Sequence, residues 1–193
     1  MKKRLAGSAL IASSLMVVFH PLLLDTSKTQ QSEFQTGSVM RAIPSGQMPV
    51  TLVETIDGDT IKVKLNGKVD TVRYLLVDTP ESKKPGMCVQ PYAVEASERN
   101  NQLVRAGRLT LEFEQGVPRD AYGRLLAYVY ANGQSVQEML VKEGFARVAY
   151  IMNPPYKYLS IYQNDETSAK RNKVKIWSKP NYVSQWGFNG CGK

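Results

Sequence analysis

Hydrophobic and polar residues alternate along much of the chain between residues 50 and 77. Such alternation is typical of strands that bury one face. Two turn signals, Asp57-Gly58 and Asn66-Gly67, interrupt the pattern. The segments 50–56, 61–65 and 69–77 are therefore predicted to form an antiparallel meander.

Helical signals follow the meander at three places. Pro91 is suited to the first turn of a helix, which predicts a helix over 91–106. The capping box Ser135-x-x-Glu138 predicts a short helix over 136–143. An amphipathic stretch at about 158–175 predicts a third helix.

Two further strands are predicted between the first two helices, at 109–114 and 125–130, with the loop 115–123 between them. Five strands with helices after the third and the fifth suit a small closed barrel better than a parallel sheet. We therefore expect an α+β, mostly β domain over residues 49–179: a five-stranded barrel with three α-helices, followed by a tail at 180–193.

The N-terminal segment differs from the rest of the chain. Three basic residues at 2–4 precede a stretch at 5–24 without formal charge, the pattern of a secretory signal peptide over residues 1–24. A retained membrane anchor is the alternative, because a 20-residue helix spans about 30 Å. Residues 25–48 are polar and aperiodic and are predicted to be a linker. We expect a secreted, extracellular protein, attached to a membrane only if the signal stays uncleaved.

The amino-acid composition excludes several classes of catalytic and metal site. The 193 residues carry a formal net charge of +8, which favours an anionic partner. The single histidine, His20, lies in the N-terminal apolar run, which excludes histidine-dependent hydrolysis, HExxH zinc sites and HNH-type nucleases. Two cysteines are too few for a cysteine-only zinc site. In an oxidising compartment Cys88 and Cys191 could form a disulfide; two unpaired thiols are the alternative.

Acidic residues cluster at two predicted strand ends. Asp59 follows the first turn, where a carboxylate can point into a barrel mouth. Asp78, Thr79 and Glu81 follow the third strand, which also contains Arg73. Carboxylate oxygens of the two aspartates and the Thr79 carbonyl would be hard ligands suited to Ca²⁺ or Mg²⁺. A solvated ion pair of the arginine with one of the acids is the alternative.

A second arginine, Arg124, begins the fifth strand after the turn Asp120–Gly123. Seen alone, it is a surface arginine beside a turn. With the acids and Arg73 it completes the parts of a metal-assisted phosphodiester hydrolase. Arginine binds phosphate through two nitrogens at once, and a divalent ion acts as a Lewis acid. Glu81 can then orient a water molecule and accept its proton.

Four segments of the chain, within a similarity that covers roughly residues 50–177, resemble the staphylococcal nuclease (thermonuclease) family. They are Ile56–Thr60, Arg73–Glu81, Asp120–Arg124 and Gly144–Tyr150. The resemblance implies an OB-fold barrel with three helices. It also implies a Ca²⁺-dependent endonuclease that acts on DNA and RNA, cleaving the 5′-oxygen–phosphorus bond and leaving 3′-phosphates.

The resemblance further assigns roles to individual residues. It implies that Asp59, Asp78 and the Thr79 carbonyl are metal ligands, and that Arg73 and Arg124 bind the phosphate. It also implies that Glu81 is the general base and that Tyr122 and Tyr150 contact the nucleotide. Whether the glutamate removes the proton or only positions the water is debated for the family. Core or rim packing is the alternative role for the two tyrosines.

The chain departs from the family at a few positions. Ala121 replaces a nucleotide-contacting lysine, and Met152 replaces a tyrosine, which puts nucleotide affinity in question. The loop 82–90 also differs.

Two other functions are alternatives to a nuclease: a non-catalytic OB-fold protein that binds single-stranded nucleic acid, and an exported Ca²⁺-binding structural module. Clustered acids would repel phosphate in the first, and the second leaves the arginines unexplained. We expect a monomer with DNA and RNA as substrates.

Overall fold

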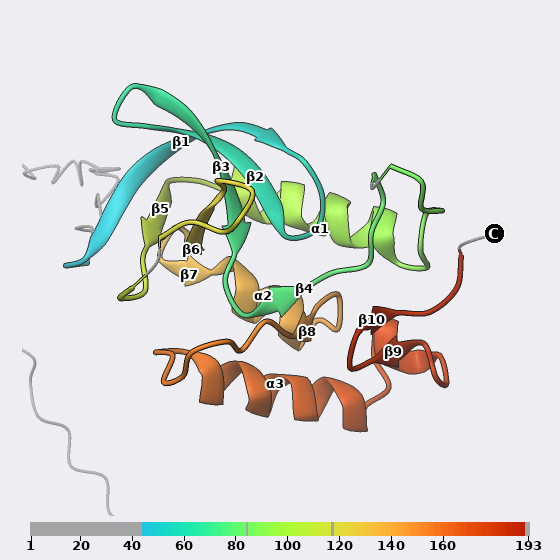
Figure 1. The fold of residues 1–193 in the computed structure, drawn as a ribbon. Coiled ribbons are helices and arrows are strands. Elements are labelled where there is room, and N and C mark those ends of the chain that lie inside the picture. Colours follow the sequence, from blue (N-terminus) through green and yellow to red (C-terminus); the bar gives the residue numbers. More distant parts are fainter. Residues whose placement is uncertain (1–43, 84, 117, 192–193) are drawn as a thin grey trace, which may run out of the picture. The chain divides into compact units, whose positions relative to one another are not determined.

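The computed structural model describes residues 44–83, 85–116 and 118–191 (Figure 1). The predicted signal peptide and residues 25–43 of the predicted linker lie outside the described residues. The elements are β1 Gln47–Thr55, β2 Thr60–Leu65, β3 Lys68–Tyr74, β4 Val77–Asp78, α1 Ala93–Arg105, β5 Leu109–Glu112, β6 Leu125–Ala131, β7 Gln134–Ser135, α2 Val136–Lys142, β8 Arg147–Val148, α3 Leu159–Arg171, a 3₁₀ turn Lys175–Ser178, β9 Val183–Ser184 and β10 Gly187–Phe188.

Five strands close into a barrel. β1 pairs antiparallel with β2 through its second half and with β5 through its first half, and β2–β3 and β5–β6 are also antiparallel. The parallel pairing of β3 with β6 closes the ring. The expected five-stranded OB-fold barrel with three α-helices is therefore confirmed. β1 begins at Gln47, earlier than expected, because β5 provides a partner for its first residues.

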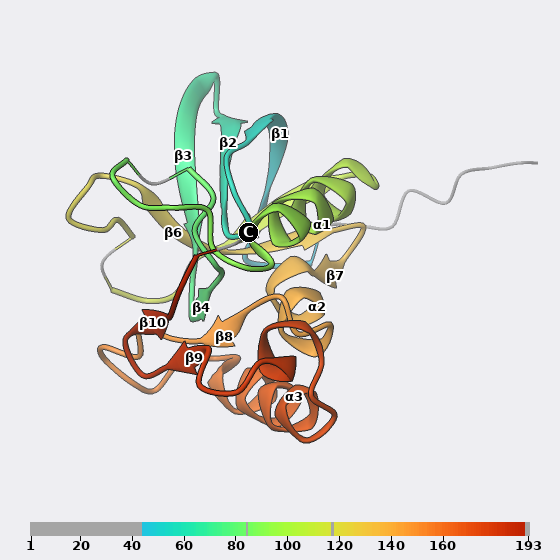
Figure 2. The ribbon, with the colours of Figure 1, turned by 90° about the vertical axis from the view of Figure 1, so that its right-hand side faces the viewer.

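The helices cover one side of the barrel around a continuous apolar core. α2 lies between the barrel and α3 in both views (Figures 1 and 2). Its N-cap is Ser135, whose side chain accepts a hydrogen bond from the backbone N–H of Glu138, as the capping box predicts. Leu140 is fully buried within the core that the barrel and the helices share. Among the described residues, no helix is long and apolar enough to cross a membrane.

The predicted third strand is interrupted. β3 ends at Tyr74, and the chain turns through Leu76, which has a left-handed backbone with φ of 64°. The following strand β4 leaves the barrel and pairs with β8 instead. The prediction of one continuous strand over 69–77 is wrong here, because apolar alternation does not reveal a left-handed turn formed by a leucine.

The C-terminal residues form a small hairpin that the sequence pattern did not predict. β9 and β10 pair with each other next to β8 (Figure 2). A disulfide joins Cys191, just beyond the hairpin, to Cys88 in the loop before α1. The structure thus contains the cysteine pairing that we favoured from the sequence.

Reduction of this disulfide is expected to lower the free energy of unfolding by about 4–5 kcal/mol, because the bond closes a loop of about 100 residues in the unfolded chain. Urea unfolding with and without dithiothreitol measures the change. The chain has two cysteines, so a reductant acts on this bond alone. The Cys88→Ser, Cys191→Ser double variant serves as a control that should not respond to dithiothreitol. A loss below about 1 kcal/mol would contradict the expectation.

Candidate active site

Asp59 lies in the connection between β1 and β2, and its carboxylate is buried. One carboxylate oxygen, Oδ2, accepts hydrogen bonds from the backbone N–H of Thr79 at 2.9 Å and from its hydroxyl at 3.1 Å. The other oxygen accepts from the Thr60 hydroxyl at 3.0 Å. The connection spans residues 56–59 rather than a two-residue turn, and its Gly58 packs so tightly that a Cβ atom would lie 2.5 Å from the Thr79 hydroxyl oxygen.

Arg73, at the end of β3, organises both the turn and the acids. Its Nη1 donates to the carbonyl oxygens of Tyr74 and Val77, at 2.9 and 2.7 Å. Its Nη2 lies 3.1 Å from Asp59 Oδ2 and 3.3 Å from Asp78 Oδ1. The guanidinium therefore holds the left-handed turn together and brings two carboxylates from distant strands to one point. The ion pair with Asp78 exists, but it is buried rather than solvated.

The pKa values of the site reflect this crowding of buried charges. Burial, together with the charge on Asp59, raises the pKa of Asp57 to about 7. Burial and the same neighbouring charge also raise the pKa of Asp78. Burial alone would lower the pKa of Arg73, but Asp59 and Asp78 outweigh it and raise that pKa, so the guanidinium stays charged. The site thus concentrates negative charge that a cation stabilises.

Arg147 on β8 is a member of the site that the sequence reasoning missed. Its Nε donates to Asp78 Oδ2 at 2.9 Å, and its Nη1 donates to the carbonyl oxygens of Ser184 and Gln185, at 3.3 and 3.2 Å. The side chain is buried. The available signal was the one that singled out Arg73: an arginine set among apolar residues of a short strand.

Tyr150 joins the same group. Its hydroxyl donates to Asp78 Oδ1 at 3.4 Å, and its ring centre lies 5.2 Å from the Arg73 guanidinium carbon. The ring is also 60% exposed, so it faces solvent at the edge of the acidic cluster. The structure therefore brings together six residues, five of them expected from the sequence: Asp59, Arg73, Asp78, Thr79, Tyr150 and the unexpected Arg147.

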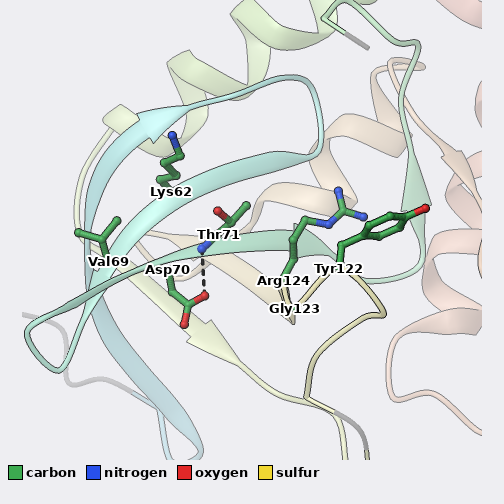
Figure 3. Close-up of a pocket in the computed structure, with 7 residues that line it drawn as sticks. All are labelled: Lys62, Val69, Asp70, Thr71, Tyr122, Gly123 and Arg124. Carbon is green, nitrogen blue, oxygen red and sulfur yellow. Dashed lines mark hydrogen bonds between the residues drawn. The ribbon is translucent and has the colours of Figure 1, made fainter. Parts of the chain in front are cut away.

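Arg124 and Tyr122 form a second group, on the segment that leads into β6. The Arg124 guanidinium carbon lies 5.5 Å from the centre of the Tyr122 ring (Figure 3). The Nε of Arg124 donates to Asp120 Oδ2 at 2.7 Å. The tyrosine ring is 86% exposed. A cavity of about 220 Å³ borders the group; it is lined by Lys62, Val69, Asp70, Thr71, Tyr122, Gly123 and Arg124.

The two groups are neighbours through the barrel seam. Arg73 pairs with Leu126 across the parallel β3–β6 ladder, and Arg124 lies two residues before Leu126, directly ahead of β6. Among the described residues, Arg124 forms its ion pair with Asp120 and none with the acidic cluster. The structure thus places the second arginine beside the first without joining them.

Glu81 lies three residues after Asp78 and is half-buried. Its backbone N–H donates to Gln90 Oε1 at 2.8 Å, and its carbonyl oxygen accepts from the Gln90 N–H at 3.1 Å. The amide of Gln90 in turn donates to the Phe188 carbonyl at 3.0 Å. The backbone of the predicted base is therefore tied to the C-terminal hairpin.

The donor set fits a hard divalent cation. Asp59 and Asp78 each direct a carboxylate oxygen to Nη2 of Arg73, and such oxygens are the ligands that Ca²⁺ and Mg²⁺ prefer. Within the described ranges, no group of three or more His, Cys, Asp or Glu side chains could hold a metal ion. Two carboxylates would leave coordination positions that water and a substrate phosphate can fill.

The fold and the site together define a small OB-fold barrel protein with buried acids framed by arginines. The chain belongs to the staphylococcal nuclease family: the family described as "Staphylococcal nuclease homologue" matches residues 71–179. The family expected from the sequence is thereby confirmed.

Individual relatives agree with this assignment. The chain is 56% identical over 168 residues to "Endonuclease YncB" of Bacillus subtilis (strain 168), which covers 87% of this chain and 80% of the relative. It is 62% identical over 144 residues to "SPbeta prophage-derived endonuclease YokF" of the same organism, covering 75% of this chain and about half (49%) of that longer relative. It is 33% identical over 178 residues to "Thermonuclease" of Staphylococcus hyicus, covering 92% of this chain and 99% of the relative.

Proposed function

We propose that this member of the nuclease family is a Ca²⁺-dependent endonuclease that hydrolyses DNA and RNA. Cleavage falls on the 5′-oxygen–phosphorus bond and leaves 3′-phosphates. The observation that carries the proposal is the convergence of the Asp59 and Asp78 carboxylates on Arg73, at the end of β3, in a chain whose relatives at 56% and 62% identity are named endonucleases. A purely binding protein has no use for buried acids beside the phosphate.

Asp59, Asp78 and the carbonyl of Thr79 are the residues that hold Ca²⁺ in this proposal. When bound, the ion supplies Lewis-acid polarisation of a phosphate oxygen. Thr79 contributes a second time, because its N–H and hydroxyl hold Asp59 in place. The fixed carboxylates need little reorganisation on binding, which favours a preorganised site.

Arg73 and Arg124 bind the phosphate and stabilise the charge that gathers on its oxygens. Arg73 is held charged by the two acids. Arg124 is bound to Asp120 in the described structure, and a phosphate competes for that guanidinium when substrate enters. Tyr122 and Tyr150 lie over the two guanidinium groups and offer exposed ring faces to the nucleotide.

Glu81 orients the attacking water and accepts its proton. Water attacks phosphorus in line, the bond from phosphorus to the 5′-oxygen breaks, and the 5′-oxygen takes up a proton from solvent to leave as a hydroxyl. The phosphate stays on the 3′-oxygen. The bonds between Glu81 and Gln90 fix the backbone from which this carboxylate extends, as positioning of a general base requires.

Chelation tests the proposal directly. The purified protein should cut plasmid DNA and RNA with Ca²⁺ and stop when EGTA removes it. Products should carry 5′-hydroxyls that polynucleotide kinase labels without prior phosphatase treatment. Salt-sensitive retention of DNA without cutting would instead identify a nucleic-acid binder. A protein that neither cuts nor retains DNA would be a structural Ca²⁺ module. Products that carry 5′-phosphates would overturn the bond assignment.

We also propose that the protein is secreted, with a signal peptide at 1–24 and a linker that runs from residue 25 to the start of β1 at Gln47. The disulfide between Cys88 and Cys191 supports this, because disulfides persist mainly in oxidising, extracytoplasmic compartments. The N-terminal sequence of protein recovered from culture medium would locate the cleavage site.

A further inference from the structure

The β9–β10 hairpin is attached directly to the acidic cluster. Arg147 bridges the two: its Nε binds Asp78, and its Nη1 binds the carbonyl oxygens of Ser184 and Gln185 at the turn of the hairpin. The ring of Phe188 on β10 lies 5.8 Å from the same guanidinium. The turn of the hairpin is therefore held at a fixed place beside the candidate active site.

The rest of the hairpin is also well anchored. The rings of Tyr182 and Phe188 lie 5.5 Å apart, and the Tyr182 hydroxyl donates to the carbonyl oxygen of Pro91. Within the turn, the Ser184 hydroxyl accepts from the Trp186 N–H and donates to the Gly187 carbonyl, both at 3.2 Å. These bonds leave the turn little conformational freedom.

This rigid turn presents an exposed tryptophan. Trp186 is 87% exposed, although it directly follows Gln185, whose carbonyl Arg147 binds. An indole is one of the largest apolar groups that a protein can bury, so leaving one in water on a fixed turn beside a functional site points to a ligand. Tyr150, 60% exposed, contacts Asp78 as well. The residue before Trp186 is linked to the same carboxylate through Arg147.

We propose that Trp186 is a base-stacking subsite for a single-stranded part of the nucleic-acid substrate. The inference rests on the proposed nuclease function and adds a contact from residues beyond the matched family region, 71–179. Aromatic side chains bind single strands by stacking on any base. In a duplex the base faces are covered by neighbouring pairs, so the subsite favours single-stranded DNA and RNA over double-stranded DNA.

Tryptophan fluorescence tests binding at this subsite. The chain has two tryptophans, so Trp177→Phe leaves Trp186 as the only source of tryptophan fluorescence. With Glu81→Gln to slow cleavage and Ca²⁺ present, an oligothymidylate should quench this emission saturably, and a duplex of equal length should quench it less. Trp186→Phe, which retains Trp177, should lose the quench. Emission that does not change with the oligonucleotide would overturn the proposal.

Kinetics test the same subsite in an otherwise native chain. Trp186→Ala should raise KM for a single-stranded oligonucleotide by about 5- to 150-fold with kcat nearly unchanged. It should leave hydrolysis of bis(p-nitrophenyl) phosphate, which has no base, as in the native chain. Trp186→Phe should recover part of the affinity. Ile161→Ala, an exposed apolar residue on α3, is the matched control and should change neither substrate.

The outcomes distinguish a failure of the Trp186 subsite from a failure of the proposed nuclease function. An unchanged KM in Trp186→Ala, with DNA still cut, overturns the subsite and leaves the nuclease proposal intact. If the native chain cuts no nucleic acid, the nuclease proposal fails, and the fluorescence titration, repeated without the Glu81 substitution, still decides whether Trp186 binds a strand. Equal losses on the oligonucleotide and on bis(p-nitrophenyl) phosphate would show that the substitution damages the site as a whole, and would also overturn base stacking.

Discussion

Replacing Arg124 with alanine should reduce kcat on DNA by about 10³- to 10⁵-fold, the range in which charge-stabilising arginines act in phosphoryl transfer. In the proposed mechanism the guanidinium binds the phosphate and stabilises the charge that develops on its oxygens. Its contacts in the structure are with Asp120 and the Tyr122 ring, and its side chain is one-third exposed. The cost to folding should therefore be small, about 1 kcal/mol or less.

Arg119→Ala is the matched control for this substitution. Arg119 precedes the same turn, pairs with the carboxylate of Asp70 and is more exposed than Arg124. It should cut DNA at close to the native rate. Initial rates at saturating DNA, with thermal unfolding of each variant, decide the matter. Native-like cutting by Arg124→Ala would remove this arginine from the mechanism, and equal losses in both variants would indicate damage to the loop.

Replacing Glu81 with glutamine should lower kcat by about 10²- to 10⁴-fold, the usual contribution of a general base, while KM stays within about threefold. The amide has the same shape and can still orient a water molecule, but it cannot accept the proton. The backbone bonds to Gln90 do not involve the side chain of Glu81 and should survive.

Single-turnover kinetics on a defined oligonucleotide measure this step without product release. Glu54→Gln, at an exposed carboxylate on β1 that pairs with Lys62, serves as the control and should behave like the native chain. A loss below tenfold in Glu81→Gln would mean that the glutamate positions the water without removing its proton. A rise in KM that accounts for the whole loss would assign Glu81 to substrate binding instead.

Much of the barrel could be predicted because its signals are local. The meander follows from alternation and from Gly-containing turns, and α2 follows from its Ser135 cap. The parallel β3–β6 seam has no local signal, because a helix and two other strands separate its strands in the sequence. The break at Leu76 depends on guanidinium bonds from Arg73 that an apolar pattern does not encode.

The candidate site divides in the same way. Asp59, Asp78 and Arg73 stand out as charged residues at strand ends, and the structure brings them together. Arg147 was missed because its partner Asp78 lies 69 residues away in the sequence. The hairpin that Arg147 supports consists of two-residue strands, too short to show any alternation.

The seam between β3 and β6 has a consequence for how members of this fold can diverge. Adjacent strands of a sheet run about 4.8 Å apart, so the main-chain positions of Arg73 and Leu126 are fixed relative to each other by the hydrogen-bond ladder, and Arg124 lies two residues before Leu126. The length of the connection between β5 and β6 does not enter that spacing. Insertions or deletions ahead of the turn at Asp120 can therefore change the rim of the barrel while the β3–β6 ladder keeps its register.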